Sequence, residues 1–439
     1  MGLAGLAGLF AWIAICRHWP FIADALALPG PRARLDGPHA ALAALLFSTG
    51  PMVAVSLLVD KVHRRASTGI DWSRRRPLSQ TARASMVKLA GLWATWVILA
   101  CAYALGRWYW DGQYLFAMQV LAAAAIPLFV LSVPYVVWLD RYLENPRDQA
   151  WHFGAMLLGR EAHDFEAVKK HWRAWIIKGF FGAFMISILP PGFAAAVNAD
   201  FAAIARDPAA IGMALIMLLF LVDVQIGTVG YLMTFRPLDA HIRSGNPYLA
   251  GWLAALMCYP PFVFAIMGSG LLGYEFGTPG QGDANWTVWL AGQPLLMWVW
   301  AMLLVALTAI YAWATVAFGL RFSNLTYRGV LTNGPYRFTR HPAYLSKNLF
   351  WWLSTLPFLV TNASATDAVR NVTSLLLVNL IYYWRARTEE DHLWHEDGKY
   401  RAYHAWMSDH GLVTAPLTRL KRRLGVRVRG FDPVAQPAE

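Results

Sequence analysis

The feature that most constrains this chain is a succession of long apolar segments separated by charged loops. Each segment is long enough to cross a hydrocarbon core of about 30 Å as a helix. A helix is expected because the backbone of a membrane-spanning segment has to satisfy its own hydrogen bonds. The segments cover roughly residues 39–59, 86–106, 115–139, 174–197, 209–235, 249–273 and 289–320.

Three shorter apolar stretches complete the pattern. Residues 3–16 follow no charged region and precede no small-residue cleavage site, so they predict a retained N-terminal helix rather than a cleaved signal peptide. Residues 348–361 and 369–384, with a polar break between them, predict a tight helical hairpin. We therefore expect an all-α integral membrane protein with about ten transmembrane segments and a C-terminal helical hairpin.

The composition supports a membrane location and argues against nucleic acid as a partner. Charged residues make up 15% of the chain, and its 22 tryptophans are a type favoured at membrane interfaces. We attribute the net charge of +12 to loops that face anionic lipid headgroups. The dispersed Cys16, Cys101 and Cys258 predict buried small hydrophobic residues rather than disulfides or a zinc site.

The distribution of Lys and Arg predicts the orientation in the membrane. Loop 60–88 is rich in both and should be cytoplasmic. Alternation then places the basic loops 140–173, 236–248 and 321–347 on the same side, together with both termini. The opposite loops, 107–114, 198–208 and 274–288, carry few positive charges. The connection 17–38 disagrees, because it falls outside with Arg17, Arg32 and Arg34.

A polar, aromatic stretch at residues 328–347 stands between two apolar segments. The turn at Gly334 and the break at Pro342 leave backbone groups available to a ligand. Arginine side chains such as Arg340 hold anions in a planar, bidentate way, and tyrosines and histidines donate or accept hydrogen bonds. The alternative is that basic and aromatic residues lie at a membrane edge without any function. The stretch also contains Arg328, Tyr336, Arg337, His341, Tyr344 and Lys347.

A second polar cluster follows the last apolar segment. If the helix continues, Arg385 and Glu389 lie four residues apart on one face, which suits a ligand carrying both an ammonium and a carboxylate. The alternative is an ordinary ion pair at a helix end. Glu390 and Asp391 are expected to be solvated. His392 and His395 lack a clear third ligand, so no metal site is predicted.

Together these residues resemble the isoprenylcysteine carboxyl methyltransferase family, with its bacterial relatives and phospholipid N-methyltransferase-like proteins. The matching pieces are GPYRFTRHPAY at 334–344, RTEEDHL at 387–393 and DGKYRAY at 397–403. The loop, the hairpin, the R-x-x-x-E-E run and the tyrosine-containing tail occur in the family's order. The tail departs slightly, because one residue separates Gly398 from Tyr400 where two are more usual. The resemblance covers about residues 321–406.

The resemblance implies a membrane-embedded methyltransferase whose cytoplasmic loops bind S-adenosylmethionine. Arg385 matches a position that contacts substrate, and Arg385 and Glu389 are the predicted catalytic residues. Arg340 joins the cofactor set because its guanidinium suits an anion. The whole predicted cofactor set is Arg328, Gly329, Val330, Leu331, Tyr336, Arg340, His341, Pro342, Ala343, Tyr344 and Glu389.

Three regions are predicted along the chain. Residues 1–285 form a multi-pass membrane region of unknown role, which short family members lack. Residues 286–410 form the methyltransferase-like membrane module. Residues 411–439 form a basic cytoplasmic tail, which either attaches to anionic headgroups or is a disordered, positively charged end.

The predicted reaction is methyl transfer to a lipophilic or membrane-associated acceptor, whose reacting group is a carboxylate, a thiol or an amine. The acceptor should enter from the bilayer and the cofactor from the cytoplasm, which the active site faces. If the source is bacterial, the protein should lie in the cytoplasmic (inner) membrane. The oligomeric state is left open. One alternative is an NADPH-dependent reductase of a sterol-like lipid, because the arginine-rich loop suits a 2′-phosphate, although the Glu389–Glu390 run is unlike such enzymes.

Asp223 suggests a second alternative, a transporter. It lies near the middle of segment 209–235, close to Gln225. An ionisable group at that depth usually faces a cavity or a partner. Asp223 could therefore bind a substrate headgroup, help to translocate a cation, or pack as a hydrogen-bonded carboxyl group.

Overall fold

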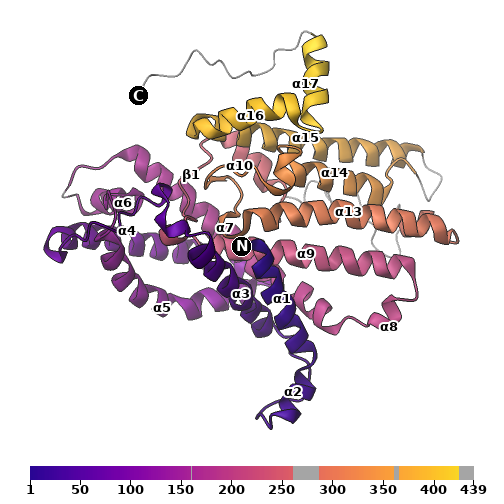
Figure 1. Ribbon diagram of the computed structural model, residues 1–439, viewed down its shortest axis with the longest axis horizontal. Coiled ribbons are helices and arrows are strands. Elements are labelled where there is room, and N and C mark those ends of the chain that lie inside the picture. The colour runs from indigo at the N-terminus through magenta and orange to yellow at the C-terminus, as the bar shows by residue number, and fades with distance from the viewer. Residues whose placement is uncertain (160, 261–285, 360–364, 425–439) are drawn as a thin grey trace. The chain divides into compact units, whose positions relative to one another are not determined.

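The computed structural model describes residues 1–159, 161–260, 286–359 and 365–424. The described chain is almost entirely helical (Figure 1). Its strands are the two-residue β1 (Ser244–Gly245) and β2 (Thr326–Tyr327), which pair antiparallel with Ser244 opposite Tyr327. The residues group into two compact units, which are described separately.

Six helical stretches among the described residues are long and apolar enough to cross a membrane. Each coincides with a segment predicted from the sequence, so a multi-pass, all-α architecture is confirmed. A further span would result if α1 and α2, bent by 70°, formed one broken crossing. The apolar segment at 249–273 lies partly outside the described residues. The six stretches are Pro38–Val59, Leu78–Leu105, Tyr114–Asp140, Phe165–Asn198, Pro208–Leu232 and Pro294–Arg321.

The first unit contains residues 1–198, 224–245 and 319–328. Its helices are α1 (Gly2–Arg17), α2 (Trp19–Ala25), α3 (Pro38–Ala54), α4 (Leu78–Leu105), α5 (Tyr114–Asp140), α6 (Gln149–Leu158), α7 (Phe165–Asn198) and the end of α9 (Pro208–Leu232). Short helical turns are η1 (Val55–Val59), η2 (Val62–Arg64), η3 (Ala66–Thr68), η4 (Arg107–Trp110), η5 (Arg236–Leu238) and η6 (Gly319–Arg321).

Close helix packing in the first unit depends on a small residue. Helices α1 and α3 lie side by side (Figure 1). A Cβ atom added at Gly8 would lie 1.9 Å from the Phe47 carbonyl oxygen, which no side chain tolerates. The stacked rings of Trp12 and Phe47, with centroids 4.2 Å apart, continue this contact. Glycine at position 8 therefore sets the distance between these two helices.

The second unit contains residues 199–223, 246–318 and 329–439, of which the structure describes all but the gaps named above. Besides the first part of α9, its elements are α8 (Phe201–Ile204), α10 (Leu249–Leu256), α12 (Trp286–Trp289), α13 (Pro294–Phe318), η7 (Gly334–Arg337), α14 (Pro342–Thr355), α15 (Ala365–Glu396), α16 (Gly398–His410) and α17 (Thr414–Arg423).

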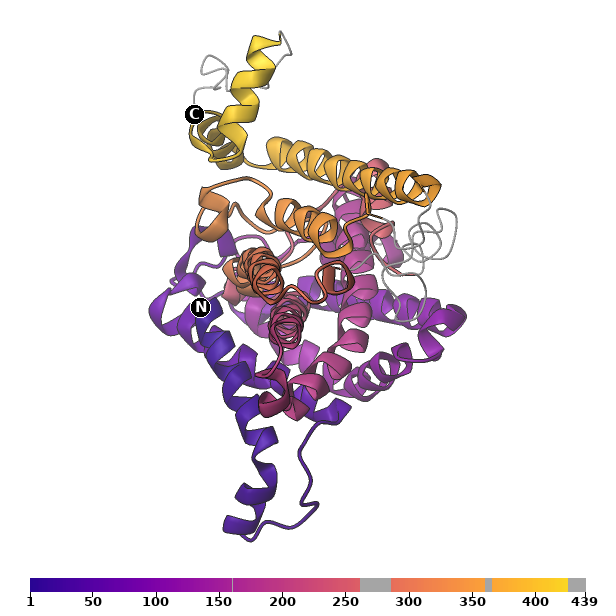
Figure 2. The ribbon, with the colours of Figure 1, turned by 90° about the vertical axis from the view of Figure 1, so that its right-hand side faces the viewer.

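Helices α13, α14 and α15 lie one above another in the second unit, as both views show (Figures 1 and 2). A core of Ile216, Trp286, Met297, Leu304 and Leu356 fills the space around α13. Helix α14 begins with Pro342, which lacks the N–H that a first helical turn leaves unpaired anyway. This layered stack carries the two polar clusters predicted from the sequence.

The beginning of the predicted tail is also ordered as a helix. Asp397 caps α16 by accepting a hydrogen bond from the Lys399 amide at 2.9 Å. Helix α17 then turns away from α16 (Figure 2) and ends in Lys421, Arg422 and Arg423. Residues 425–439 lie outside the described part of the chain.

Candidate active site

The first cluster is a folded loop that packs against α13. Gly334 has φ = 60°, a left-handed conformation that favours glycine. A Cβ atom there would lie 3.1 Å from the Ala317 side chain and 3.4 Å from the Trp313 indole. The next residue, Pro335, is buried and lies in the short turn η7. The Gly-Pro pair thus both turns the chain and lets it approach the helix.

The second cluster lies on α15, which continues without a break through residue 396. Arg385 and Glu389 share one face, as their spacing predicts, and their Nε and Oε1 atoms are 3.3 Å apart. The Tyr344 hydroxyl donates to the same Oε1 atom at 2.5 Å. This contact joins the two predicted clusters across 45 residues of sequence.

Arg385 lies among aromatic rings. It is 3% exposed, and its guanidinium carbon is 5.1 Å from the centre of the Tyr344 ring. The rings of Tyr259 and Tyr382 lie 5.9 and 6.0 Å from the same atom. Aromatic faces attract a cation in this range, which offsets part of the cost of burying it. The charge is therefore held in a fixed position beside Glu389.

The expectation that Glu390 is solvated is wrong. Glu390 is 4% exposed and lies among three cationic or ionisable groups. Its Oε1 atom is 3.0 Å from Arg340 Nε and 3.0 Å from His341 Nε2, and its Oε2 atom is 3.2 Å from Arg387 Nη1. Sequence spacing reveals the Arg387 contact, but the two contacts from the loop depend on tertiary packing.

The environment of Glu390 favours its charged form. Burial alone would raise the pKa of this carboxyl group. The hydrogen bond and charge of His341, followed by the charge of Arg340, outweigh burial and lower the pKa to about 2. Glu390 is thus an anionic anchor that holds the end of the first cluster against α15.

His341 has a second neighbour in Tyr344. Their rings are nearly parallel, with an interplanar angle of 6° and centroids 5.6 Å apart. Tyr344 also contacts Tyr382 edge to face at 5.4 Å. His341 therefore orients Tyr344, whose hydroxyl reaches Glu389, while its own Nε2 atom faces Glu390.

The tyrosine-containing tail holds the loop in place. The Tyr403 hydroxyl donates to the Tyr336 carbonyl oxygen at 2.6 Å. Val330 packs against a cluster that includes the buried Tyr400, Tyr403 and Met407. Farther on, the Leu412 amide donates to the Phe338 carbonyl oxygen at 2.8 Å. Three elements of the sequence pattern, the loop, α15 and α16, are thereby brought together in one unit.

Arg328 belongs to the first unit, whereas residues 329–331 belong to the second. Its guanidinium is buried and donates to backbone carbonyls at the ends of segments in its own unit, including Leu320 at 2.7 Å, Phe322 at 2.8 Å and Gly230 at 2.9 Å. Burial lowers the pKa of Arg328 to about 9. A cofactor contact at this position would have to come from its backbone.

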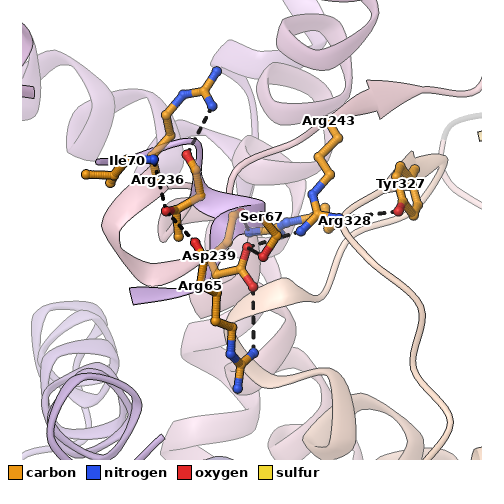
Figure 3. Close-up of polar contacts among 10 residues, drawn as sticks. Arg65, Ser67, Ile70, Arg236, Asp239, Arg243, Tyr327 and Arg328 are labelled. Atoms are coloured by element: carbon orange, nitrogen blue, oxygen red, sulfur yellow. Dashed lines mark hydrogen bonds and ion pairs between the residues drawn. The ribbon is translucent and has the colours of Figure 1, made fainter. Parts of the chain in front are cut away.

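Asp239, near Arg328 in the same unit, is an organising residue that sequence reasoning missed (Figure 3). Its carboxylate accepts from Ser67 Oγ at 3.0 Å and Arg243 Nη2 at 3.1 Å, and Arg65 Nη1 lies 3.6 Å away. Its φ of 49° is a conformation that aspartate tolerates better than most residues. Among so many basic loop residues, nothing local in the sequence marks this aspartate.

Asp223 is 8% exposed and lies in the second unit. It accepts a hydrogen bond from the Thr315 hydroxyl on α13, and the Tyr311 hydroxyl lies beside it. Gln225, its neighbour in sequence, belongs to the first unit and donates to Ser48 Oγ at 3.0 Å. The two polar residues of this helix therefore have different partners.

Comparison with known families gives one match. Residues 286–395 match the isoprenylcysteine carboxyl methyltransferase family. The matched region, a quarter of the chain, contains α13, α14, almost all of α15 and the loop between α13 and α14, and it ends before α16. No significant match is found among curated proteins or solved structures. The resemblance predicted from the sequence motifs is confirmed for this C-terminal module.

The polar groups of the matched region fit a small zwitterionic cofactor. Arg340 Nη1 is buried and has no hydrogen-bond partner among the described residues, so it is a donor available to an anion. Glu389 retains a carboxylate oxygen, Oε2, beyond the one shared by Tyr344 and Arg385. In the described part of the chain, no cluster of three or more His, Cys, Asp or Glu side chains has the arrangement of a metal site.

Proposed function

We propose that this protein is a membrane methyltransferase that uses S-adenosylmethionine and acts on a lipophilic acceptor. The observation that carries the proposal is the Tyr344–Glu389–Arg385 contact, which unites both motif clusters inside the matched family region. When bound, the cofactor supplies an activated methyl group on a sulfonium. The protein's own task is then to orient two partners and exclude water.

Individual residues have distinct proposed roles. Glu389 accepts hydrogen bonds from the cofactor's ammonium or ribose hydroxyls, and Arg340 Nη1 holds its carboxylate. The cofactor site is lined by Tyr336, His341, Tyr344, the first turn of α14 at Pro342 and Ala343, and the backbone of residues 329–331. Arg385, fixed by three rings and Glu389, orients the acceptor.

We further propose ten membrane segments, with the cofactor side in the cytoplasm, where S-adenosylmethionine is made. The charge distribution of the loops supports this orientation. The acceptor would enter from the bilayer, and α17 with its terminal Lys421, Arg422 and Arg423 would lie on anionic headgroups. We also propose that the chain divides into a membrane region at residues 1–285, a methyltransferase-like module at 286–410 and a basic tail at 411–439.

Titration calorimetry on the full-length protein in lipid nanodiscs tests the assignment. Wild-type protein should bind S-adenosylmethionine, and Glu389→Gln should weaken binding about tenfold, equivalent to roughly 1.4 kcal/mol. Glu396→Gln, a charge removal on the exposed end of the same helix, is the matched control and should leave the affinity unchanged.

Two results would overturn the proposal. Binding of NADPH without binding of S-adenosylmethionine would indicate the reductase alternative. Failure to bind either ligand, together with a cation flux in proteoliposomes that Asp223→Asn abolishes, would indicate a transporter. If S-adenosylmethionine binds, incubation of the methyl-labelled cofactor with membrane lipid extracts then identifies the class of acceptor.

A further inference from the structure

Lys347 is a cation within the second unit, three residues beyond Tyr344 on α14. Its Nζ atom is surrounded by three aromatic rings, with centres 5.3 Å away for Trp351, 5.4 Å for Tyr311 and 5.9 Å for Tyr382. The side chain makes no hydrogen bond or ion pair in the described part of the chain. Its three N–H donors are therefore available, although the rings stabilise its charge.

Asp223 is the matching anion. Its carboxylate accepts from Thr315, but no cation lies within 4 Å of it among the residues that the structure describes. Lys347 is nevertheless close enough to attract it. Tyr311 links the two, because its ring faces Lys347 and its hydroxyl lies beside Asp223. Two opposite charges thus stand near each other without touching.

The separation of these charges indicates what could lie between them. Asp223 lies within a candidate membrane span, as do Thr315 and Tyr311, so an uncompensated charge there is costly. A ligand with a single negative charge would satisfy Lys347 and be repelled by Asp223. A simple amine would do the reverse. A group that carries both charges satisfies both residues, and the neighbouring Arg385 is already paired with Glu389.

We propose that Lys347 and Asp223 bind the zwitterionic headgroup of an amphiphile, with an anionic oxygen group against Lys347 and an ammonium group against Asp223. The position fits an acceptor site. Lys347 and Arg385 both face the Tyr382 ring, and Arg385 contacts the Glu389 of the candidate cofactor site. The identification of this amphiphile as the methyl acceptor rests on the proposed function, whereas its binding does not.

Native mass spectrometry of the full-length protein released from detergent tests the headgroup preference. Three probes share short acyl or alkyl chains: dioctanoyl phosphatidylethanolamine carries both charges, dioctanoyl phosphatidylglycerol carries the anion alone, and dodecylamine carries the cation alone. Wild-type protein should retain the zwitterionic probe about tenfold better than either single-charge probe. A preference for a single-charge probe, or equal retention of all three, would overturn the proposal without the need for any variant.

Two variants make the test charge-specific. Lys347→Met should lose the zwitterionic preference and favour dodecylamine, whereas Asp223→Asn should favour phosphatidylglycerol. Lys399→Met and Asp60→Asn, which remove exposed charges elsewhere, should behave as wild type. Equal loss of all probes in both variants would assign these residues a structural role and contradict the proposal.

Calorimetry with S-adenosylmethionine separates this inference from the proposed function. Both variants should bind the cofactor as wild type does, because neither residue contacts Glu389, Arg340 or His341. A wild-type protein that retains the zwitterionic probe but does not bind S-adenosylmethionine would keep the headgroup site and reject the methyltransferase assignment. A wild-type protein that binds S-adenosylmethionine but shows no preference for the zwitterionic probe would reject the headgroup site alone.

Discussion

At the scale of single residues, this protein depends on charges buried with specific partners. Glu390 is held by Arg340, His341 and Arg387, and Arg385 is held by three aromatic rings and Glu389. Removing one partner from such a group leaves the others uncompensated, which costs more than the pair contributes. These residues therefore couple the stability of the second unit to the geometry of the candidate site.

Glu390→Gln should destabilise the protein at neutral pH by about 3 kcal/mol, because Arg340 and Arg387 lose their anion. The lowered pKa of Glu390 also gives a pH dependence. Its contribution is fully present above the ordinary value of 4.5 and is lost as the pH falls through about 2. As the pH falls, the melting temperature of the detergent-solubilised wild-type protein should thus decrease more steeply than that of the variant. Parallel curves would contradict this interpretation.

At the scale of elements, two kinds of contact hold helices together. Close approach at Gly8 joins α1 to α3, and a hydrogen bond from the Tyr403 hydroxyl helps to join α16 to the loop before α14. The first contact lies outside the candidate site, whereas the second one fixes the backbone of Tyr336, a residue of that site. One small chemical group tests each contact: a methyl group added at Gly8, or the hydroxyl removed from Tyr403.

Tyr403→Phe removes the hydroxyl that donates to the Tyr336 carbonyl oxygen. The loss of one buried hydrogen bond costs about 1 kcal/mol, so we expect a several-fold weaker affinity for S-adenosylmethionine in calorimetry. Tyr383→Phe on the exposed face of α15 is the control. An unchanged affinity in Tyr403→Phe would mean that α16 does not position the loop.

Gly8→Ala should lower the melting temperature, because its Cβ would collide with the Phe47 carbonyl oxygen and push α1 from α3. Gly50→Ala on α3 has no atom within 4 Å of its added Cβ. Alanine favours a helix over glycine by about 1 kcal/mol, so this variant should be neutral or more stable. Equal effects of the two substitutions would rule out a close contact at Gly8.

At the scale of the whole molecule, the orientation in the membrane decides whether the candidate site faces the compartment that contains the proposed cofactor. Residues 60–88 are rich in Lys and Arg, whereas 198–208 are not. This contrast predicts opposite sides of the membrane for the two loops. The candidate site would share the side of the basic loop.

Cysteine accessibility measures this orientation in intact cells, in a background without the three native cysteines. Ala205→Cys should react with a membrane-impermeant maleimide before lysis, and Ser79→Cys should react after lysis alone. Both positions are exposed in the structure, so a failure to react cannot be attributed to burial. Reversed labelling would move the candidate site to the outer face.

The sequence by itself determined the all-α, multi-pass architecture of this protein and the motifs of its C-terminal module, whereas the number of ten segments stays a prediction. Long apolar runs have few ways to satisfy their backbone in lipid, so they specify helices. Residues four apart on a helix share a face wherever that helix lies, so Arg385 and Glu389 were paired correctly. The family match at 286–395 confirms the resemblance that the motifs predicted.

The tertiary structure alone decided which distant side chains meet. Glu390 looked solvated in sequence, yet Arg340 and His341 reach it from another element. In the sequence Arg328 is one basic residue of a polar loop, and only the structure shows that its guanidinium donates to the carbonyl oxygens of Gly230, Leu320 and Phe322. The approach of Lys347 to Asp223 depends on how α9, α13 and α14 pack. Long-range packing brings such partners together, and neither hydropathy nor local spacing encodes it.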